Sequence, residues 1–104
     1  MIDRMVFVRL KDEYRSDAER RAIAAHSQDA LRTVPQVRAI HVATALDDKT
    51  RQDWDLLLVI QLESVEDLEP FRTDPIHRDY VDNYLKPKMA QIKGWNFCWP
   101  GPPR

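Results

Sequence analysis

The stretch SVEDLEPFRTDPIHRDYVDNYL, residues 64 to 85, decides how the rest of the chain is interpreted. Ser64 follows an apolar run and precedes two acids, so we expect its hydroxyl to cap a helix whose positive end favours those acids. Val65, Leu68 and Phe71 recur every three residues and predict the buried face of that helix. A proline inside the same turn removes a backbone donor, which should keep the helix short or kinked.

A second helix start follows directly, because Asp74 is a favourable N-cap and Pro75 a favourable first helical residue. His77 is then the third helical residue, near unpaired backbone amides and the positive end of the dipole. Both disfavour the imidazolium, so we expect a neutral ring that can accept a proton. The alternative is a structural histidine that hydrogen-bonds to a tyrosine or a carbonyl. The helical face should continue through Tyr80, Val81, Tyr84, Leu85, Met89 and Ile92.

The 104 residues have the length of one domain, residues 1 to 104, with a tail from residue 100. The net charge of −1 creates no field that favours nucleic acid or an anionic membrane as a partner. No segment resembles a signal peptide or is long and apolar enough to span a membrane. The single cysteine, Cys98, excludes an internal disulfide and is typical of a reducing compartment. These features predict a cytoplasmic protein without a nucleic-acid or membrane partner.

Four segments have the apolar alternation or apolar run of strands: residues 4 to 10, 37 to 46, 54 to 62 and 94 to 99. The third is apolar on both sides, with Trp54 on the side of Leu56, and should therefore be a central strand.

Ser16 and Glu19 have capping-box spacing and predict a helix that ends near residue 34. Its buried side is expected to contain Ala22, Ile23, Ala30 and Leu31. Residues 47 to 53 are interpreted as a polar connector, and residues 86 to 93 as a broken helical tail.

The order β-α-β-β-α-β predicts an α+β fold of the ferredoxin-like kind, with an antiparallel four-stranded sheet and both helices on one side. The opposite face would then carry an apolar patch that includes Met5, Phe7, His41, Leu57, Val59 and tryptophan. A patch of this size on a small protein indicates a partner, and two copies packed sheet on sheet would cover it. We therefore expect a two-fold homodimer.

No metal ion or cofactor is predicted. The three histidines are scattered, and none forms a pair with ligand spacing on one element. His26 is interpreted as a solvated or half-buried helix residue, and His41 as an edge residue of a packed sheet face rather than a ligand. The only glycines are Gly94 and Gly101, so no phosphate-cradling loop is present in the sequence.

Several segments together resemble a known family. These are RMVFVRLKDE, VPQVRAI, DLLLVIQLESVEDLEPF, and DPIH followed by a helix and an aromatic strand. The chain resembles a stress-responsive dimeric α/β-barrel (Dabb) protein from residue 3 to residue 99. The resemblance implies a homodimeric barrel of two ferredoxin-like halves with an apolar cavity between helices and sheet in each half. The residues expected to line the ligand site are Arg4, Val6, Ile23, Leu58, Ile60, Phe71 and Tyr84.

One characterised member of that family, olivetolic acid cyclase, closes a polyketide by an intramolecular aldol step. His77 matches the histidine that serves as its catalytic base. Two positions depart, because the cyclase has tyrosine in place of Phe71 and histidine in place of Arg4. Arg4 could instead hold an anionic group of a substrate by a bidentate contact.

The sequence is compatible with three functions. The first is a dimeric binding or structural domain without chemistry, whose ligand would be a small apolar or anionic molecule. The second is an enzyme on a small carbonyl compound, with His77 as general base, Arg4 as anion clamp, and Tyr80 or Tyr84 as proton donor. The third is a cofactor-free oxygenase acting on electron-rich aromatic compounds.

Overall fold

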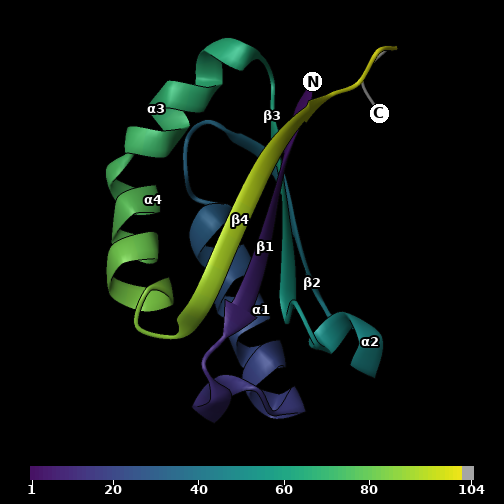
Figure 1. Ribbon diagram of the computed structural model, residues 1–104. Helices are drawn as coiled ribbons and strands as arrows, with labels where there is room; N and C mark the ends of the chain where they lie inside the picture. The colour runs from purple at the N-terminus through teal and green to yellow at the C-terminus, as the bar shows by residue number, and fades with distance from the viewer. Residues whose placement is uncertain (102–104) are drawn as a thin grey trace.

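The computed structural model describes residues 1–101 as an antiparallel sheet with a layer of helices (Figure 1). The strands are β1 (Ile2–Leu10), β2 (Val37–Thr44), β3 (Leu56–Leu62) and β4 (Met89–Cys98), in the spatial order β2-β3-β1-β4. The helices are α1 (Asp17–Leu31), α2 (Asp48–Arg51), α3 (Leu68–Thr73) and α4 (Pro75–Asp79). Single turns are η1 (Asp12–Tyr14), η2 (Val65–Asp67) and the π-helical η3 (Tyr80–Leu85).

This arrangement confirms the predicted ferredoxin-like fold. The predicted C-terminal tail extends into residues 102 to 104, which lie outside the described residues.

The hydrophobic core lies between one face of the sheet and the helices. Because side chains alternate along a strand, Val6, Val8 and Leu10 of β1 face the helices together and are at most 6% exposed. β3 pairs with β1 in register, with Leu58 opposite Val6. The layer that covers this face contributes Ile23, Leu31, Phe71, Tyr80 and Leu85 to the same cluster.

Two of the three predicted helix caps are present. The Ser16 hydroxyl accepts a hydrogen bond from the Glu19 amide at 3.1 Å, and the Asp74 carboxylate accepts one from the Ile76 amide at 2.9 Å. The expected cap at Ser64 is wrong, because its side chain makes no capping hydrogen bond to η2. The chain passes from η2 directly into α3, whose own first residue is Leu68.

The prediction of a helical tail over residues 86 to 93 is wrong. β4 already begins at Met89 and pairs with β1 along its whole length, so it starts five residues before the predicted strand. The Lys11 amide donates to the Lys88 carbonyl at 2.8 Å and closes the strand pair. Pairing with the edge of β1 therefore decides the conformation of these residues, because their helical pattern is weak. The expected helical face ends at Leu85.

The connector and the strands beside it also differ from expectation. Residues 47 to 53 contain the short helix α2, which Asp47 caps by accepting from the Thr50 amide at 2.9 Å. β2 stops at Thr44, so Leu46 lies outside the sheet and is 87% exposed. Trp54 precedes β3 and does not follow its alternation; its ring packs on Phe7, on the face opposite to Leu56.

The buried side of α1 is shifted from the predicted one. Ala22 is exposed, whereas Ser27 is fully buried. Ile23 and Leu31 are buried as expected, at 1% exposure each. Ser27 can face the core because Tyr80 supplies a hydrogen bond to its hydroxyl.

A buried ionic cluster closes one end of the sheet. Asp55 is fully buried and accepts hydrogen bonds from the Leu10 amide and from Arg20 Nε, both at 2.8 Å, and from Arg15 Nε at 3.2 Å. Burial alone would raise the pKa of Asp55, but these hydrogen bonds outweigh it and lower the pKa below its ordinary value. The cluster ties the end of β1 to α1 and to the start of β3.

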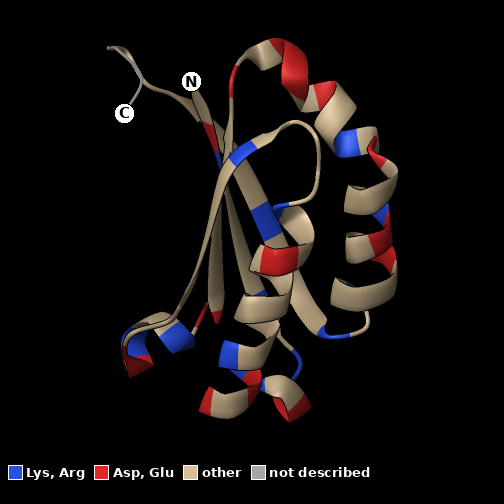
Figure 2. Cartoon of the chain, turned by 180° about the vertical axis from the view of Figure 1, so that it is seen from behind, with Lys and Arg blue, Asp and Glu red and all other residues tan. Residues whose placement is uncertain are grey.

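The other face of the sheet is not covered by a helix in residues 1–101, as predicted (Figure 1). Figure 2 shows that Lys, Arg, Asp and Glu gather on the helices and connections, whereas the strands are mostly free of charge. Trp95, Phe97 and Trp99 are 49%, 58% and 43% exposed on this side. We call this surface the open sheet face; it comprises Met5, Phe7, Leu57, Val59, Trp95 and Phe97.

Candidate functional site

His77 lies at the third position of α4, as the sequence predicts. Its Nδ1 is 3.2 Å from the Arg72 carbonyl oxygen, and its ring lies 4.2 Å from the Phe71 ring, centroid to centroid. The hydrogen bond to a carbonyl places the Nδ1 proton on that side, which leaves Nε2 as the acceptor. Phe71, at 1% exposure, fixes the position of the imidazole from the core side.

The surroundings of His77 favour the neutral ring. Burial lowers the pKa of His77 below 6.5, and the positive charges of Arg78 and Arg4 act in the same direction. The Arg72 carbonyl and the Asp74 carboxylate oppose this shift without reversing it. The direction agrees with the sequence-based expectation, but the leading cause is burial rather than the helix dipole.

Arg4 reaches the same region from β1. Its Nη1 donates to Asn96 Oδ1 on β4 at 3.1 Å, and partial burial lowers the pKa of Arg4. The guanidinium crosses β4 at Gly94, where a Cβ atom would lie 2.8 Å from Arg4 Nη2. The missing side chain of Gly94 therefore leaves room for the arginine, and Asn96 orients it.

The two tyrosines proposed as donors have other partners. The Tyr80 hydroxyl donates to Ser27 Oγ at 2.6 Å inside the core, and burial raises the pKa of Tyr80 to about 12. Tyr84 stacks on His26 with ring centroids 3.7 Å apart, while Lys88 Nζ lies 4.0 Å from its centroid. Burial, followed by the charge of Glu19, raises the pKa of Tyr84. His26 thus has a stacking role at the surface.

The structure brings His77, Phe71 and Arg4 into one region, but Tyr80 and Tyr84 face different partners. The apolar residues expected to line a cavity are packed in the core cluster and are at most 6% exposed; they are Val6, Ile23, Leu58, Ile60 and Phe71. His77 and Arg4, whose charge acts on the imidazole, lie beside this packed core, and Asn96 binds the arginine. We call these three residues the edge site.

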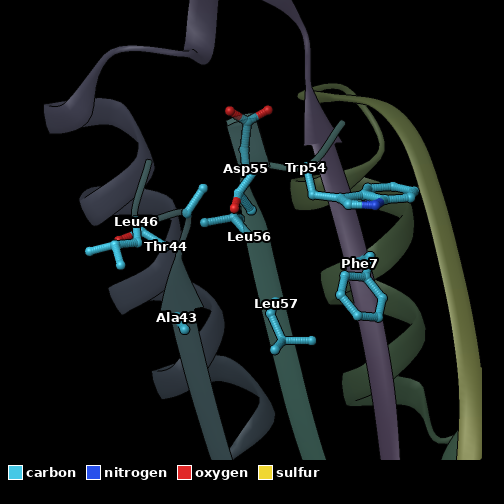
Figure 3. Close-up of a pocket in the computed structure, with 10 residues that line it drawn as sticks. Phe7, Ala43, Thr44, Leu46, Trp54, Asp55, Leu56 and Leu57 are labelled. Atoms are coloured by element: carbon cyan, nitrogen blue, oxygen red, sulfur yellow. The ribbon is translucent and has the colours of Figure 1, made fainter. Parts of the chain in front are cut away.

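Two hollows on the open sheet face were not anticipated from the sequence. One has a volume of about 230 Å³, and Figure 3 shows Ala43 of β2, Leu57 of β3 and Phe7 of β1 across its floor, with Trp54 at one side. The second has a volume of about 520 Å³ and is lined by Met5, Val59, Phe97 and Trp99. The sequence has apolar residues on both faces of the central strands. This pattern predicts that apolar side chains are exposed on one face of the sheet, but it does not predict that this face is hollowed.

Within residues 1–101, no group of three or more His, Cys, Asp or Glu side chains could hold a metal ion. His41 and Asp3 both line a further hollow on the open sheet face, of about 240 Å³, and its described lining contains no third residue of these types. Among the described helices, none is long and apolar enough to cross a membrane.

The sequence was also compared with models of protein families. The model of the stress responsive A/B barrel domain, Dabb, matches residues 2–94. The chain belongs to the Dabb family. This match covers β1, β2, β3, the His77 region and the first part of β4, up to Gly94, and it confirms the resemblance derived from the sequence. No curated protein matches this Dabb chain.

Solved structures share the fold. An Arabidopsis thaliana protein aligns with a TM-score of 0.80 at 11% identity over 100% of both chains. A dimeric ferredoxin-like protein of unknown function from Bacteroides fragilis aligns with a TM-score of 0.74 at 16% identity, over 94% of this chain and 95% of its own. A hydroxynitrile lyase from Passiflora edulis aligns with a TM-score of 0.75 at 18% identity, over 98% and 96%. At these identities the likeness concerns the fold of the Dabb domain alone.

Proposed function

We propose that this Dabb protein is a homodimer, joined through the open sheet face, that binds a small molecule. The observation that carries the proposal is the set of large aromatic side chains left exposed on one side of the sheet, with Phe97 at 58% and Trp95 at 49% exposure. Contiguous apolar surface of this kind is typical of an interface. The B. fragilis neighbour, which has the same fold, is described as dimeric and supports this proposal.

A second copy is the partner that fits this surface best. A two-fold axis places the same patch on both sides of an interface, so a flat apolar face complements itself. Charged residues such as Asp3, opposite Phe97, and Lys93, opposite Phe7, share this side of the sheet with its six apolar residues, so two such faces would bury more apolar than charged side chains. Dimerisation would also close the hollow of about 520 Å³ between Met5, Val59 and Phe97.

The ligand is proposed to be a small apolar molecule or an anion. An apolar molecule would fit the hollows that the partner closes, because their lining is aromatic and aliphatic. An anionic group would fit the edge site, where Arg4 presents a guanidinium beside a neutral His77. The single cysteine leads us to propose the cytoplasm as the location of the protein.

The first test is the mass of the native chain in solution. Sedimentation equilibrium at micromolar concentration is expected to give roughly twice the protomer mass of 12.3 kDa. A single species at the protomer mass across the concentration range would contradict the proposed homodimer.

The second candidate function is proton transfer on a small carbonyl compound, with His77 as general base. The lowered pKa and the free Nε2 of His77 favour it, and Arg4 could neutralise an anionic substrate. Tyr80 would be the donor only if a substrate displaced its hydrogen bond to Ser27. The hydroxynitrile lyase among the structural neighbours makes hydroxynitriles a reasonable addition to a panel of carbonyl compounds and keto acids.

The variants His77→Ala and His77→Gln test this candidate. If His77 is a base, each should lower kcat by about 100-fold or more, while circular dichroism and the melting temperature stay close to native. Native turnover should be constant above pH 6.5 and fall only below it, because a lowered pKa keeps His77 neutral to lower pH.

Arg38 offers a control, because it is exposed and its only ion pair in the described residues is with Glu63. The Arg38→Ala variant should leave turnover unchanged. Absence of turnover by the native protein across the panel, or full activity of the His77→Ala variant, would exclude the base.

A further inference from the structure

A polar cavity of about 260 Å³ lies at the N-terminal end of α1, away from His77. Its lining contains three arginines, Arg20 and Arg21 of α1 and Arg51 of α2, together with Asp17 and residues 44 to 46 at the end of β2. In Figure 2 the positively charged stretches of α1 and α2 lie at the same end of the molecule. Neither the fold nor the proposed function assigns a role to this cavity.

Arg20 is held rigidly at the wall of the cavity. Its side chain is 9% exposed, its Nε donates to the buried Asp55 at 2.8 Å, and its Nη1 donates to Asp17 at 3.1 Å. No hydrogen bond occupies its Nη2 among the described residues. A guanidinium fixed on one edge by a buried carboxylate presents its remaining donors in a defined direction, with little side-chain entropy left to lose.

The other two arginines add further donors. Arg51 Nη2 donates to the carbonyls of Ala45 and Leu46 at 3.3 and 3.2 Å, and its buried Nε has no acceptor within residues 1–101. Arg21 is exposed and has no ion pair or hydrogen bond in the described part of the chain. The lining therefore offers more N–H donors than it has acceptors to satisfy them.

The charge balance points the same way. Three guanidiniums and one carboxylate line the cavity, a net charge of +2. Asp55, which binds Arg15 and Arg20, and Asp48, which pairs with Arg51 at 3.1 Å, offset part of this charge. With Arg15 and these two acids included, four guanidiniums stand against three carboxylates, and the surplus of one positive charge still favours an anion. A carboxylate would use one fork of donors, whereas a phosphate has oxygens for guanidiniums that approach from two different helices.

We propose that this cavity binds a phosphate group. Arg20 provides the rigid contact, Arg21 closes over the ion from solvent, and Arg51 faces it from α2. The site is separate from the edge formed by His77 and Arg4, so it adds an anion-binding function to the Dabb domain that does not depend on the ligand or chemistry proposed there.

The test uses the native full-length chain and inorganic phosphate, methyl phosphate and acetate at one ionic strength, with binding followed by calorimetry and by amide shifts in NMR spectra. Saturable binding of phosphate or methyl phosphate, with shifts at residues 17 to 21 and 44 to 51, is expected, and acetate should bind more weakly. Methyl phosphate binding more tightly than phosphate would identify an ester-borne group as the ligand, and the reverse order a free ion. Equal binding of acetate, or no saturable binding up to about 10 mM, would overturn the proposal.

Substitutions at and away from the cavity test where phosphate binds. Arg21→Ala should weaken phosphate binding by about tenfold without affecting folding, because Arg21 is exposed and unpaired. Asp17→Asn should strengthen it, because that change removes the carboxylate that repels the ion. Arg38→Ala, at an exposed pair on β2, is the matched control and should bind as the native chain does. Loss of binding in Arg4→Ala with no change in Arg21→Ala would place the ion at the other site and refute this one.

Discussion

The Asp55→Ala variant is expected to lose about 3–5 kcal/mol of unfolding free energy. Asp55 is the common acceptor for the Leu10 amide and for the Arg15 and Arg20 guanidiniums, and it is fully buried. Its removal leaves Arg20, itself 7% exposed, charged and without its main counter-ion. Removal of one partner from such a buried cluster destabilises the fold strongly, because a buried charge is left unpaired. Replacement of the whole cluster by apolar residues would change the stability much less.

Urea unfolding at a fixed protomer concentration measures this loss, since a dimer's stability depends on concentration. Asp55→Asn keeps an acceptor for the Leu10 amide and should lie between Asp55→Ala and native. Asp29→Ala removes a surface carboxylate that pairs with Arg32 at 2.6 Å, and should change stability by less than about 1 kcal/mol. An Asp55→Ala loss no larger than that of Asp29→Ala would show that the buried cluster is not needed for stability.

The same cluster should make the protein sensitive to acid. Because the folded pKa of Asp55 is lowered, its contribution is fully present above the unfolded value of 3.8 and is lost as pH falls through the folded pKa.

The sequence predicted the fold because its periodic signals were supported by tertiary contacts. The alternation through Val6 and Val8, the cap at Ser16 and the Asp74-Pro75 start all describe local geometry that the core then stabilises. The prediction was wrong where the local pattern was weak and a distant partner decided the outcome. Residues 89 to 93 form part of a strand because they pair with the edge of β1, which is distant in the sequence. The helical spacing of Met89 and Ile92 gives no information about that pairing.

The same difference between local and long-range information explains which parts of the candidate site could be predicted. The position of His77 and the direction of its pKa follow from the helix start, which is local. The partners of Tyr80 and Arg4 are Ser27 and Asn96, which lie 53 and 92 residues away in the chain. Hydrogen bonds across such separations depend on the exact register of sheet and helices, so residue spacing alone could not assign the tyrosine to the core.

Trp95→Glu is expected to convert the proposed homodimer into a monomer. Trp95 lies on the edge strand β4, opposite Met5 of β1, and its ring is near the Phe7 ring, 5.9 Å between centroids. It is 49% exposed on the open sheet face, so a second copy would bury it. A carboxylate in that position would have to lose its water without gaining a partner, which should weaken association by about 100-fold or more.

Sedimentation velocity over a range of concentrations measures the shift from dimer to monomer. Val65→Glu is the matched control, because Val65 is 61% exposed on η2, outside the open sheet face, and its charge should leave the dimer intact. The Trp95→Glu protomer should keep its fold, since the core on the helix side of the sheet does not include Trp95. A Trp95→Glu protein that remains dimeric would mean that the subunits join through another surface, and the aromatic face would then need a different partner.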